Sequence, residues 1–232
     1  GRADLIMLPE TFLSGFSNEA IGDAETMEGA GIRWMLDLAR ETGAVLTGSL
    51  IVRAGSRVHN RLVWARPDGT LAHYDKRHLF RMAGEHERYA GGSERLIVEV
   101  HGWRVCPLVC YDLRFPVYSR NCFDAAAQRL DYDLLLYVAN WPSPRRHAWR
   151  TLLRARAIEN LAYCVGVNRV GVDGNQLPYA GDSVALDFLG EAIVELGGDA
   201  GVVTARLSAE RLATHRERFP AWMDADAFAL ET

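Results

Sequence analysis

The sequence has 232 residues, of which 49% are hydrophobic and 24% are charged, a balance that suits one globular domain with a large core. Its formal net charge of -4 argues against the basic surface of a nucleic-acid-binding protein and against attraction to an anionic membrane. No apolar run approaches the roughly 20 residues that a membrane span needs.

Strand-like and helical segments alternate along the first half of the chain. The helix expected over residues 31–42 has apolar residues at helical spacing, and Gly43 follows as a stop signal. The turn over residues 67–70 and the pair His101-Gly102 each join two strands into a hairpin. The strands expected in this half cover residues 4–9, 44–52, 57–66, 71–75, 94–100 and 103–110.

The second half continues the alternation. Helices are expected over residues 117–130 and 146–161, the second of them strongly amphipathic. Residues 133–139 form a continuous apolar run, which is typical of a strand covered on both faces. Ser208 is placed to cap a last short helix that has Glu210 in its first turn. Further strands are expected over residues 163–170, 183–187, 192–195 and 202–207. Hairpins mixed with alternating strands and helices indicate an α/β sandwich with its helices outside.

The four cysteines indicate a reducing compartment, which we take to be the cytoplasm. They form no CxxC pair, and a chain of this size needs no disulfide for stability. Cys106 and Cys110 share a strand face by parity, but no histidine cluster joins them, so we expect no metal site. The other two cysteines are Cys122 and Cys164.

Three chemically useful side chains stand at the ends of expected strands. Glu10 offers a base, Lys76 a fixed cation and Cys110 a nucleophile, and acyl transfer through a thioester requires that set. Each residue also has an ordinary interpretation. Glu10 suits a solvated loop or a helix cap, Lys76 stands in a charged run typical of a solvated face, and Cys110 suits an inert core thiol.

In their local phrases, the same three residues resemble the nitrilase (carbon-nitrogen hydrolase) superfamily. The phrases are LPETF around Glu10, YDKRHLF around Lys76 and VCYDLRFP around Cys110. The resemblance runs from Asp4 to about Ala205 and implies an α-β-β-α sandwich with two central mixed sheets. It also implies one carbon-nitrogen hydrolase domain over residues 1–232, in which the family's N-terminal strand and helix have no counterpart in this sequence.

Further phrases resemble the ω-amidase branch, which acts on 2-oxoglutaramate and 2-oxosuccinamate. They are YVANWP (137–142), RARAIEN (154–160), NRVG (168–171), GDS (181–183) and FPAW (219–222). This resemblance implies a cysteine amidohydrolase that releases ammonia from small ω-amides and uses no cofactor. It also implies a homodimer or higher homo-oligomer, with residues 208–232 forming a tail at the dimer interface.

The resemblance assigns roles to the candidate residues. Glu10 takes the thiol proton, Cys110 attacks the amide carbon, and Lys76 stabilises the oxyanion together with the backbone N–H of Tyr111. A second glutamate supports the lysine, and Glu85 is preferred to Glu87 for this position.

The residues expected to bind substrate are Asn140, Trp141 and Arg145. Asn140 and Trp141 end a strand and are expected to line the pocket. A keto-acid carboxylate needs a cation, and Arg145 or Arg146 suits it because the guanidinium fork matches a carboxylate. An ion pair between Asp112 and Arg114 is expected to brace the nucleophile loop.

Two alternatives stay open on the sequence. A nitrilase or an N-carbamoyl amidohydrolase would use the same Glu-Lys-Cys triad on another leaving group. A catalytically silent scaffold of the same fold would need none of the three residues, and their joint presence disfavours it.

Overall fold

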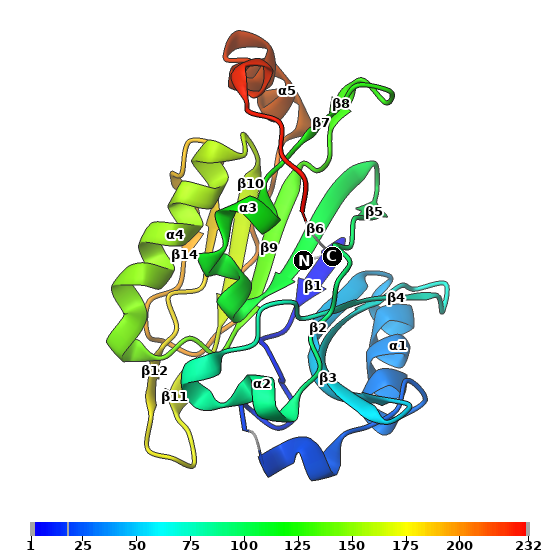
Figure 1. The fold of residues 1–232 in the computed structure, drawn as a ribbon. Helices are drawn as coiled ribbons and strands as arrows, with labels where there is room; N and C mark the ends of the chain where they lie inside the picture. Colours follow the sequence, from blue (N-terminus) through cyan, green and yellow to red (C-terminus); the bar gives the residue numbers. More distant parts are fainter. Residues whose placement is uncertain (1–2, 18, 231–232) are drawn as a thin grey trace.

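Two β-sheets stacked face to face form the centre of the computed structural model, which describes residues 3–17 and 19–230 (Figure 1). The four-stranded sheet has the order β1 (Leu5–Met7), β2 (Val45–Ala54), β3 (Arg57–Ala65) and β4 (Leu71–Asp75). The six-stranded sheet has the order β14 (Ala192–Glu195), β13 (Val184–Leu186), β10 (Tyr163–Asn168), β9 (Leu134–Ala139), β6 (Trp103–Val109) and β5 (Val98–Val100). Both sheets are mixed, as the sequence predicted.

The parallel centre of the larger sheet positions the functional loops. Strand β9 pairs in parallel with β6 on one side and with β10 on the other. The register sets Val109 opposite Val138 and Asn168 opposite Ala139, so the three strands end at one edge of the sheet. Loops that follow parallel strands at such an edge are where open α/β sheets place their ligands.

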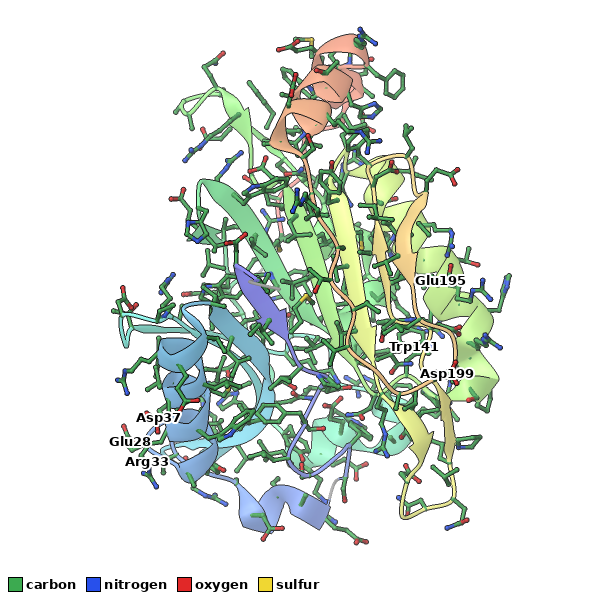
Figure 2. All side chains as sticks on the ribbon, turned by 180° about the vertical axis from the view of Figure 1, so that it is seen from behind. Glu28, Arg33, Asp37, Trp141, Glu195 and Asp199 are labelled. Atoms are coloured by element: carbon green, nitrogen blue, oxygen red, sulfur yellow. The ribbon has the colours of Figure 1, made fainter. Side chains whose placement is uncertain are left out.

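Helices cover the outer faces of both sheets. Helix α1 (Ala30–Thr42) packs Ile32, Met35 and Ala39 against the smaller sheet. The exposed side chains Arg33 and Asp37 mark its outer side in Figure 2, and Glu28 lies just before its first turn. Helix α4 (Arg146–Glu159) lies against the larger sheet at the opposite side of the molecule (Figure 1). The resulting four layers confirm the expected α-β-β-α sandwich.

Helix α4 approaches the larger sheet closely because β10 carries a glycine beneath it. Trp149 and Leu153 on the inner face of α4 are 1% and 0% exposed. A Cβ atom on Gly166 would lie 2.6 Å from Leu153 Cδ1 and 2.7 Å from Trp149 Cζ2. These separations are too short for a methyl group, so Gly166 sets the distance between the helix and the sheet.

The helix expected over residues 117–130 is wrong. Only α3 (Pro116–Ser119) is helical there. A hairpin of two short strands, β7 (Phe123–Asp124) and β8 (Arg129–Leu130), follows it. The Asn121 carboxamide donates to two backbone oxygens, Tyr132 O at 2.9 Å and Asn160 O at 3.0 Å, which anchors the chain away from a helical course. Asp124 Oδ1 then accepts the backbone N–H groups of Ala126 and Ala127 and closes a turn.

The strand expected over residues 202–207 is also wrong. This segment forms no ladder with any strand in the described part of the chain. A cavity of about 870 Å³ is lined both by β1 and by residues 199–207, so the segment does not reach a strand with which to pair. A strand needs a neighbour for its backbone groups, and an apolar run alone does not supply one.

The remaining elements are short and mostly surround the sheet edge that carries the candidate residues. Ser208 caps α5 as expected, because its Oγ accepts the Arg211 N–H at 3.2 Å. The hairpin of β11 and β12 was not anticipated as a separate sheet. These elements are η1 (Glu19–Asp23), η2 (Arg81–Ala83), α2 (Glu85–Arg88), η3 (Cys110–Arg114), η4 (Ser143–Arg145), β11 (Val170–Val172), β12 (Pro178–Ala180), α5 (Ala209–Arg218) and η5 (Ala221–Asp224).

Candidate active site

Residues far apart in the sequence meet at the edge where β6 and β9 end. Cys110 follows β6 directly, Asn140 follows β9, and Glu10 comes three residues after β1. Lys76 follows β4 in the same way. The chain therefore brings the three residues predicted to carry acyl transfer into one buried place, each at a strand end as its sequence indicated.

A buried ion cluster forms the floor of this site. Lys76 Nζ lies 3.0 Å from Glu10 Oε1 and 2.9 Å from both carboxylate oxygens of Glu85. All three side chains are at most 1% exposed. Glu87 lies outside the cluster with a 70% exposed side chain, so Glu85 is the one of the two that contacts Lys76.

The charge of Lys76 is fixed by this arrangement. Burial opposes a charged ammonium, but the Glu10 and Glu85 carboxylates outweigh it and raise the Lys76 pKa well above its ordinary 10.5. Lys76 is therefore a permanent cation and does not act as an acid or a base near neutral pH. A fixed positive charge in a buried site can stabilise an anion that develops next to it.

The Glu10 carboxylate is held by donors on both of its oxygens. Oε1 accepts Asn60 Nδ2 at 2.8 Å, and Oε2 accepts the backbone N–H of Asn140 at 2.7 Å. The Asn140 side chain also donates to the Glu10 carbonyl at 2.8 Å and to Thr11 Oγ1 at 2.9 Å. Asn140 thus positions Glu10 through both its backbone and its side chain, whereas the sequence had suggested a lining role.

Cys110 begins η3 in a left-handed backbone conformation, with φ 45°. Such a φ is uncommon for a residue with a Cβ, and strained residues of this kind concentrate at functional sites. Burial raises the pKa of the Cys110 thiol well above 9.0, the Glu10 charge raises it further, and Lys76 opposes both. The thiol therefore needs a proton acceptor at hand to become a nucleophile, and Glu10 is the carboxylate whose charge acts on it most strongly.

The other cysteines in the apolar strands lack this environment. Cys106 and Cys164 are fully buried, and burial raises the pKa of Cys106 to about 12. Burial also raises the Cys164 pKa. Neither Glu10 nor Lys76 is among the groups that act on these two thiols, so both suit inert core packing.

Asp112 braces the nucleophile loop, but its partner is not Arg114. The buried Asp112 carboxylate accepts Tyr74 Oη at 2.8 Å and Val109 N at 3.0 Å through Oδ2. Its Oδ1 lies 2.7 Å from His78 Nδ1 and 3.1 Å from His78 N. The Arg114 guanidinium instead lies 5.0 Å from the centre of the Trp141 ring. The expected ion pair is wrong because nearer donors occupy both oxygens of the carboxylate.

The residues expected to bind substrate have different surroundings. Trp141 is only 3% exposed, and its backbone N–H and C=O are both held by the Asn168 carboxamide, at 2.7 and 3.0 Å. Arg146 is engaged by Asp182 in two hydrogen bonds of 2.5 and 2.7 Å. Arg145 forms no ion pair within the described residues; its Nη2 donates to Met82 Sδ at 3.0 Å, and its guanidinium lies 5.2 Å from the centre of the Phe80 ring. Of the two arginines considered, Arg145 is the one left available for a ligand.

Aromatic rings lie close to the cluster. The Phe16 ring centre lies 5.6 Å from Lys76 Nζ, and the rings of Phe80 and Tyr111 meet edge to face at 5.0 Å. Tyr111 is the residue directly after Cys110, so its backbone N–H belongs to the turn that carries the thiol. A partly apolar rim around a charged floor suits a small polar molecule with a short carbon chain.

Sequence reasoning missed Asn60 and Asn168, the two amides that fix this edge. The bonds of Asn168 to Trp141 tie the end of β10 to the end of β9, and Asn168 also donates to Gly181 O at 2.8 Å. A signal existed for Asn60, because residues 60, 62 and 64 share one face of β3, and Leu62 and Trp64 belong to the central core. A polar side chain on a core face is expected to have a specific partner. Within the described part of the chain, no group of three or more His, Cys, Asp or Glu side chains is placed to hold a metal ion.

Comparison with known families gives a match over most of the chain. The family model described as carbon-nitrogen hydrolase matches residues 1–217. The chain is 50% identical to the omega-amidase YafV of Escherichia coli (strain K12), over 98% of this chain and 86% of that protein. It is 32% identical to the 2-oxoglutaramate amidase of Bacillus subtilis (strain 168), over 96% of this chain and 85% of that protein.

Solved structures agree with these relatives. The CN-hydrolase superfamily protein XC1258 from Xanthomonas campestris, which carries an arsenic adduct in its active site, superposes with a TM-score of 0.98. It is 59% identical and covers 100% of this chain and 88% of its own. An amidase from Nesterenkonia sp. AN1, with acrylamide added to its active-site cysteine, is 26% identical with a TM-score of 0.77, over 94% of this chain and 85% of its own.

Proposed function

Because this chain belongs to the carbon-nitrogen hydrolase (nitrilase) superfamily and is a hydrolase of amides, we propose that it cleaves small ω-amides through a thioester on Cys110. One observation carries the proposal. A thiol in a strained backbone position shares a buried site with a carboxylate, Glu10, and with a cation, Lys76, and the charges of both act on the thiol. These are a nucleophile, its base and an anion stabiliser in one place.

The reaction proceeds in two balanced steps. Glu10 takes the proton of the Cys110 thiol, the sulfur attacks the amide carbon, and the oxyanion is stabilised by Lys76 Nζ and the Tyr111 N–H. The tetrahedral intermediate collapses as Glu10 gives the proton to the nitrogen, which leaves as ammonia. Water then attacks the thioester with Glu10 as base, and the carboxylic acid and free thiol are released. Glu85 holds Lys76 and positions that water.

The proposed substrate is an ω-amide with a carboxylate at its other end, such as 2-oxoglutaramate or 2-oxosuccinamate. The names of the two relatives support this class, one an omega-amidase and the other a 2-oxoglutaramate amidase. Arg145 would bind the distal carboxylate, since its guanidinium is half-buried at the aromatic rim and forms no ion pair within the described residues. Asn140 and Trp141 shape the pocket floor by fixing the end of β9.

We further propose that the domain spans residues 1–232, works in the cytoplasm, and forms a homodimer or higher homo-oligomer. The free cysteines support a reducing compartment. Exposed apolar side chains on the C-terminal segment, Phe219 at 58% and Met223 at 67%, support an interface over residues 208–232. In the described residues, no helix has both the length and the apolar character that a bilayer span requires. Light scattering coupled to size-exclusion chromatography measures the assembly directly.

Ammonia release from a substrate panel tests the proposed reaction. The panel is 2-oxoglutaramate, 2-oxosuccinamate, glutamine, a simple nitrile and an N-carbamoyl amino acid, each with the wild type and with Cys110→Ala. Release from the keto-amides alone, dependent on Cys110, supports the ω-amidase proposal. Release from the nitrile or the carbamoyl compound instead assigns the chain to one of the alternative reactions. Equal release by Cys110→Ala contradicts the mechanism.

A further inference from the structure

A neutral amide, Asn60, lies between the two carboxylates of the ion cluster. Asn60 is on β3, is 2% exposed, and points its Nδ2 at Glu10 Oε1 over 2.8 Å and at Glu85 Oε1 over 3.4 Å. The same two oxygens accept hydrogen bonds from Lys76 Nζ. The backbone N–H of Lys76 also donates to the Asn60 carbonyl at 3.0 Å, so both donors to the carboxylates are held together.

The orientation of Asn60 is set by the carboxylates. Only the NH₂ end of the amide can face two acceptors, because its oxygen would repel them. Asn60 Oδ1 is buried and accepts no hydrogen bond from any described residue. An unpaired buried acceptor is unfavourable, so the contacts of Asn60 Oδ1 do not explain this orientation. The hydrogen bonds to Glu10 and Glu85 are what it provides.

The charge balance of the cluster shows why such a donor matters. Two carboxylates face one ammonium, so Lys76 leaves one negative charge uncompensated in a buried site. The Glu10 charge acts on the titratable groups Lys76, Cys110, Tyr89 and Tyr179, and Glu85 shares the donors Lys76 and Asn60 with Glu10. Among the described residues, Lys76 and Asn60 are the side chains that donate to its carboxylate oxygens. Asn60 adds a second donor without a second charge and has no proton to exchange during turnover.

Resting on the proposed function, we propose that Asn60 is a positioning residue that keeps Glu10 ionised and oriented toward the Cys110 thiol, and so sets the acid limit of thiol activation. A hydrogen bond to a carboxylate favours its charged form. Removing this donor takes away one of the hydrogen bonds that hold the Glu10 carboxylate in place. Glu10 and Cys110 remain the groups that react.

The test compares Asn60→Leu with Asn121→Leu, because Leu is similar in size to Asn but cannot donate. Asn121 is a matched control, since it is also a buried asparagine with two donated hydrogen bonds, but to Tyr132 O and Asn160 O. The readout is the rate of Cys110 alkylation by iodoacetamide as a function of pH, with kcat/KM for the keto-amide as the second readout. Alkylation needs no amide substrate, so it answers the question about Asn60 even if the panel reveals a different substrate.

The alkylation rate of Cys110 falls as the pH is lowered, and we call this falling part of the pH profile the acid limb. We expect Asn60→Leu to shift the acid limb to higher pH by about one unit, while the rate on the high-pH plateau is retained. Below the limb this is a roughly tenfold slower reaction. Asn121→Leu should leave the limb where it is. Asn60→Ser, whose shorter hydroxyl can donate to one carboxylate, should move it in the same direction by less.

Three results would overturn the proposal. One is an unmoved limb in Asn60→Leu, even if activity falls, because a purely structural role predicts a uniform loss. Another is an equal shift in Asn121→Leu. The third is failure of both Asn60 variants to fold, judged by near-ultraviolet circular dichroism, while Asn121→Leu folds.

Discussion

Replacing Asp112 by asparagine should both destabilise the fold and slow the nucleophile. The carboxylate accepts hydrogen bonds from Tyr74 and Val109 on one oxygen and from two N–H groups of His78 on the other. Asparagine keeps the size but turns an NH₂ group toward one of these pairs. Tyr74 Oη or His78 Nδ1 can then accept from that NH₂ group, but a backbone N–H, of Val109 or of His78, loses its acceptor whichever way the amide is oriented.

The expected loss follows from the number of donors. A donor left unpaired in this way costs about 1–3 kcal/mol, so Asp112→Asn should lose about 1–3 kcal/mol of folding free energy. For a domain of this size, each kcal/mol corresponds to roughly 2–4 °C in Tm, so a loss of about 3 kcal/mol lowers Tm by about 6–12 °C. Because Val109 precedes Cys110, alkylation of the thiol should slow as well.

Thermal unfolding followed by circular dichroism measures this change, with Asp224→Asn as a control. Asp224 is exposed and should give an unchanged Tm. A Tm for Asp112→Asn that lies within about 1 °C of the wild type would refute the reasoning, because it would mean that the four donors find other partners at no cost.

Three further predictions concern other parts of the molecule. Lys76→Arg should be nearly as inactive in ammonia release as Cys110→Ala. The reason is that a wider guanidinium cannot replace a compact ammonium between two buried carboxylates. Near-normal turnover of Lys76→Arg would count against the role of Lys76. Gly166→Ala should lower the free energy of unfolding, measured with urea, by about 1–3 kcal/mol through overpacking. Leu153→Ala in the same chain should recover part of that loss. Additive losses from the two substitutions would contradict the contact. Burial lowers the pKa of His59 below 6.5 despite the nearby Asp75, so the folded state favours neutral His59 and its contribution to stability is lost as pH falls below 6.5. Unfolding free energies between about pH 7.5 and pH 5 should decrease less steeply in His59→Gln, and identical slopes would refute this assignment.

The strands that bury both faces were predictable because their signal is local. The apolar run over residues 133–139 is β9, paired on both sides, and the amphipathic pattern after residue 146 is α4. The helix predicted over residues 117–130 was wrong because the course of this segment depends on distant contacts. Its alanines favour a helix, but the contacts of Asn121 with distant backbone oxygens decide its course, and no local pattern reports such contacts.

The same division holds for the candidate site. Glu10, Lys76 and Cys110 were identifiable because each stands at a strand end in a recognisable phrase, and the fold brings them together. Asn60 was not, because an asparagine within a strand acquires meaning only when the opposite carboxylates are known. The pairing of Asp112 with Arg114 was expected from sequence proximity, whereas burial placed the carboxylate among Tyr74, His78 and a backbone N–H.

The central claim is that Cys110 carries the acyl group during turnover. Rapid acid quench of the enzyme with the keto-amide, followed by peptide mass spectrometry, tests it most directly. We predict an adduct with the mass of the substrate minus ammonia on the peptide that contains Cys110, and no adduct on Cys106, Cys122 or Cys164. Turnover without any adduct on that peptide, together with ammonia release by Cys110→Ala at the wild-type rate, would contradict the account.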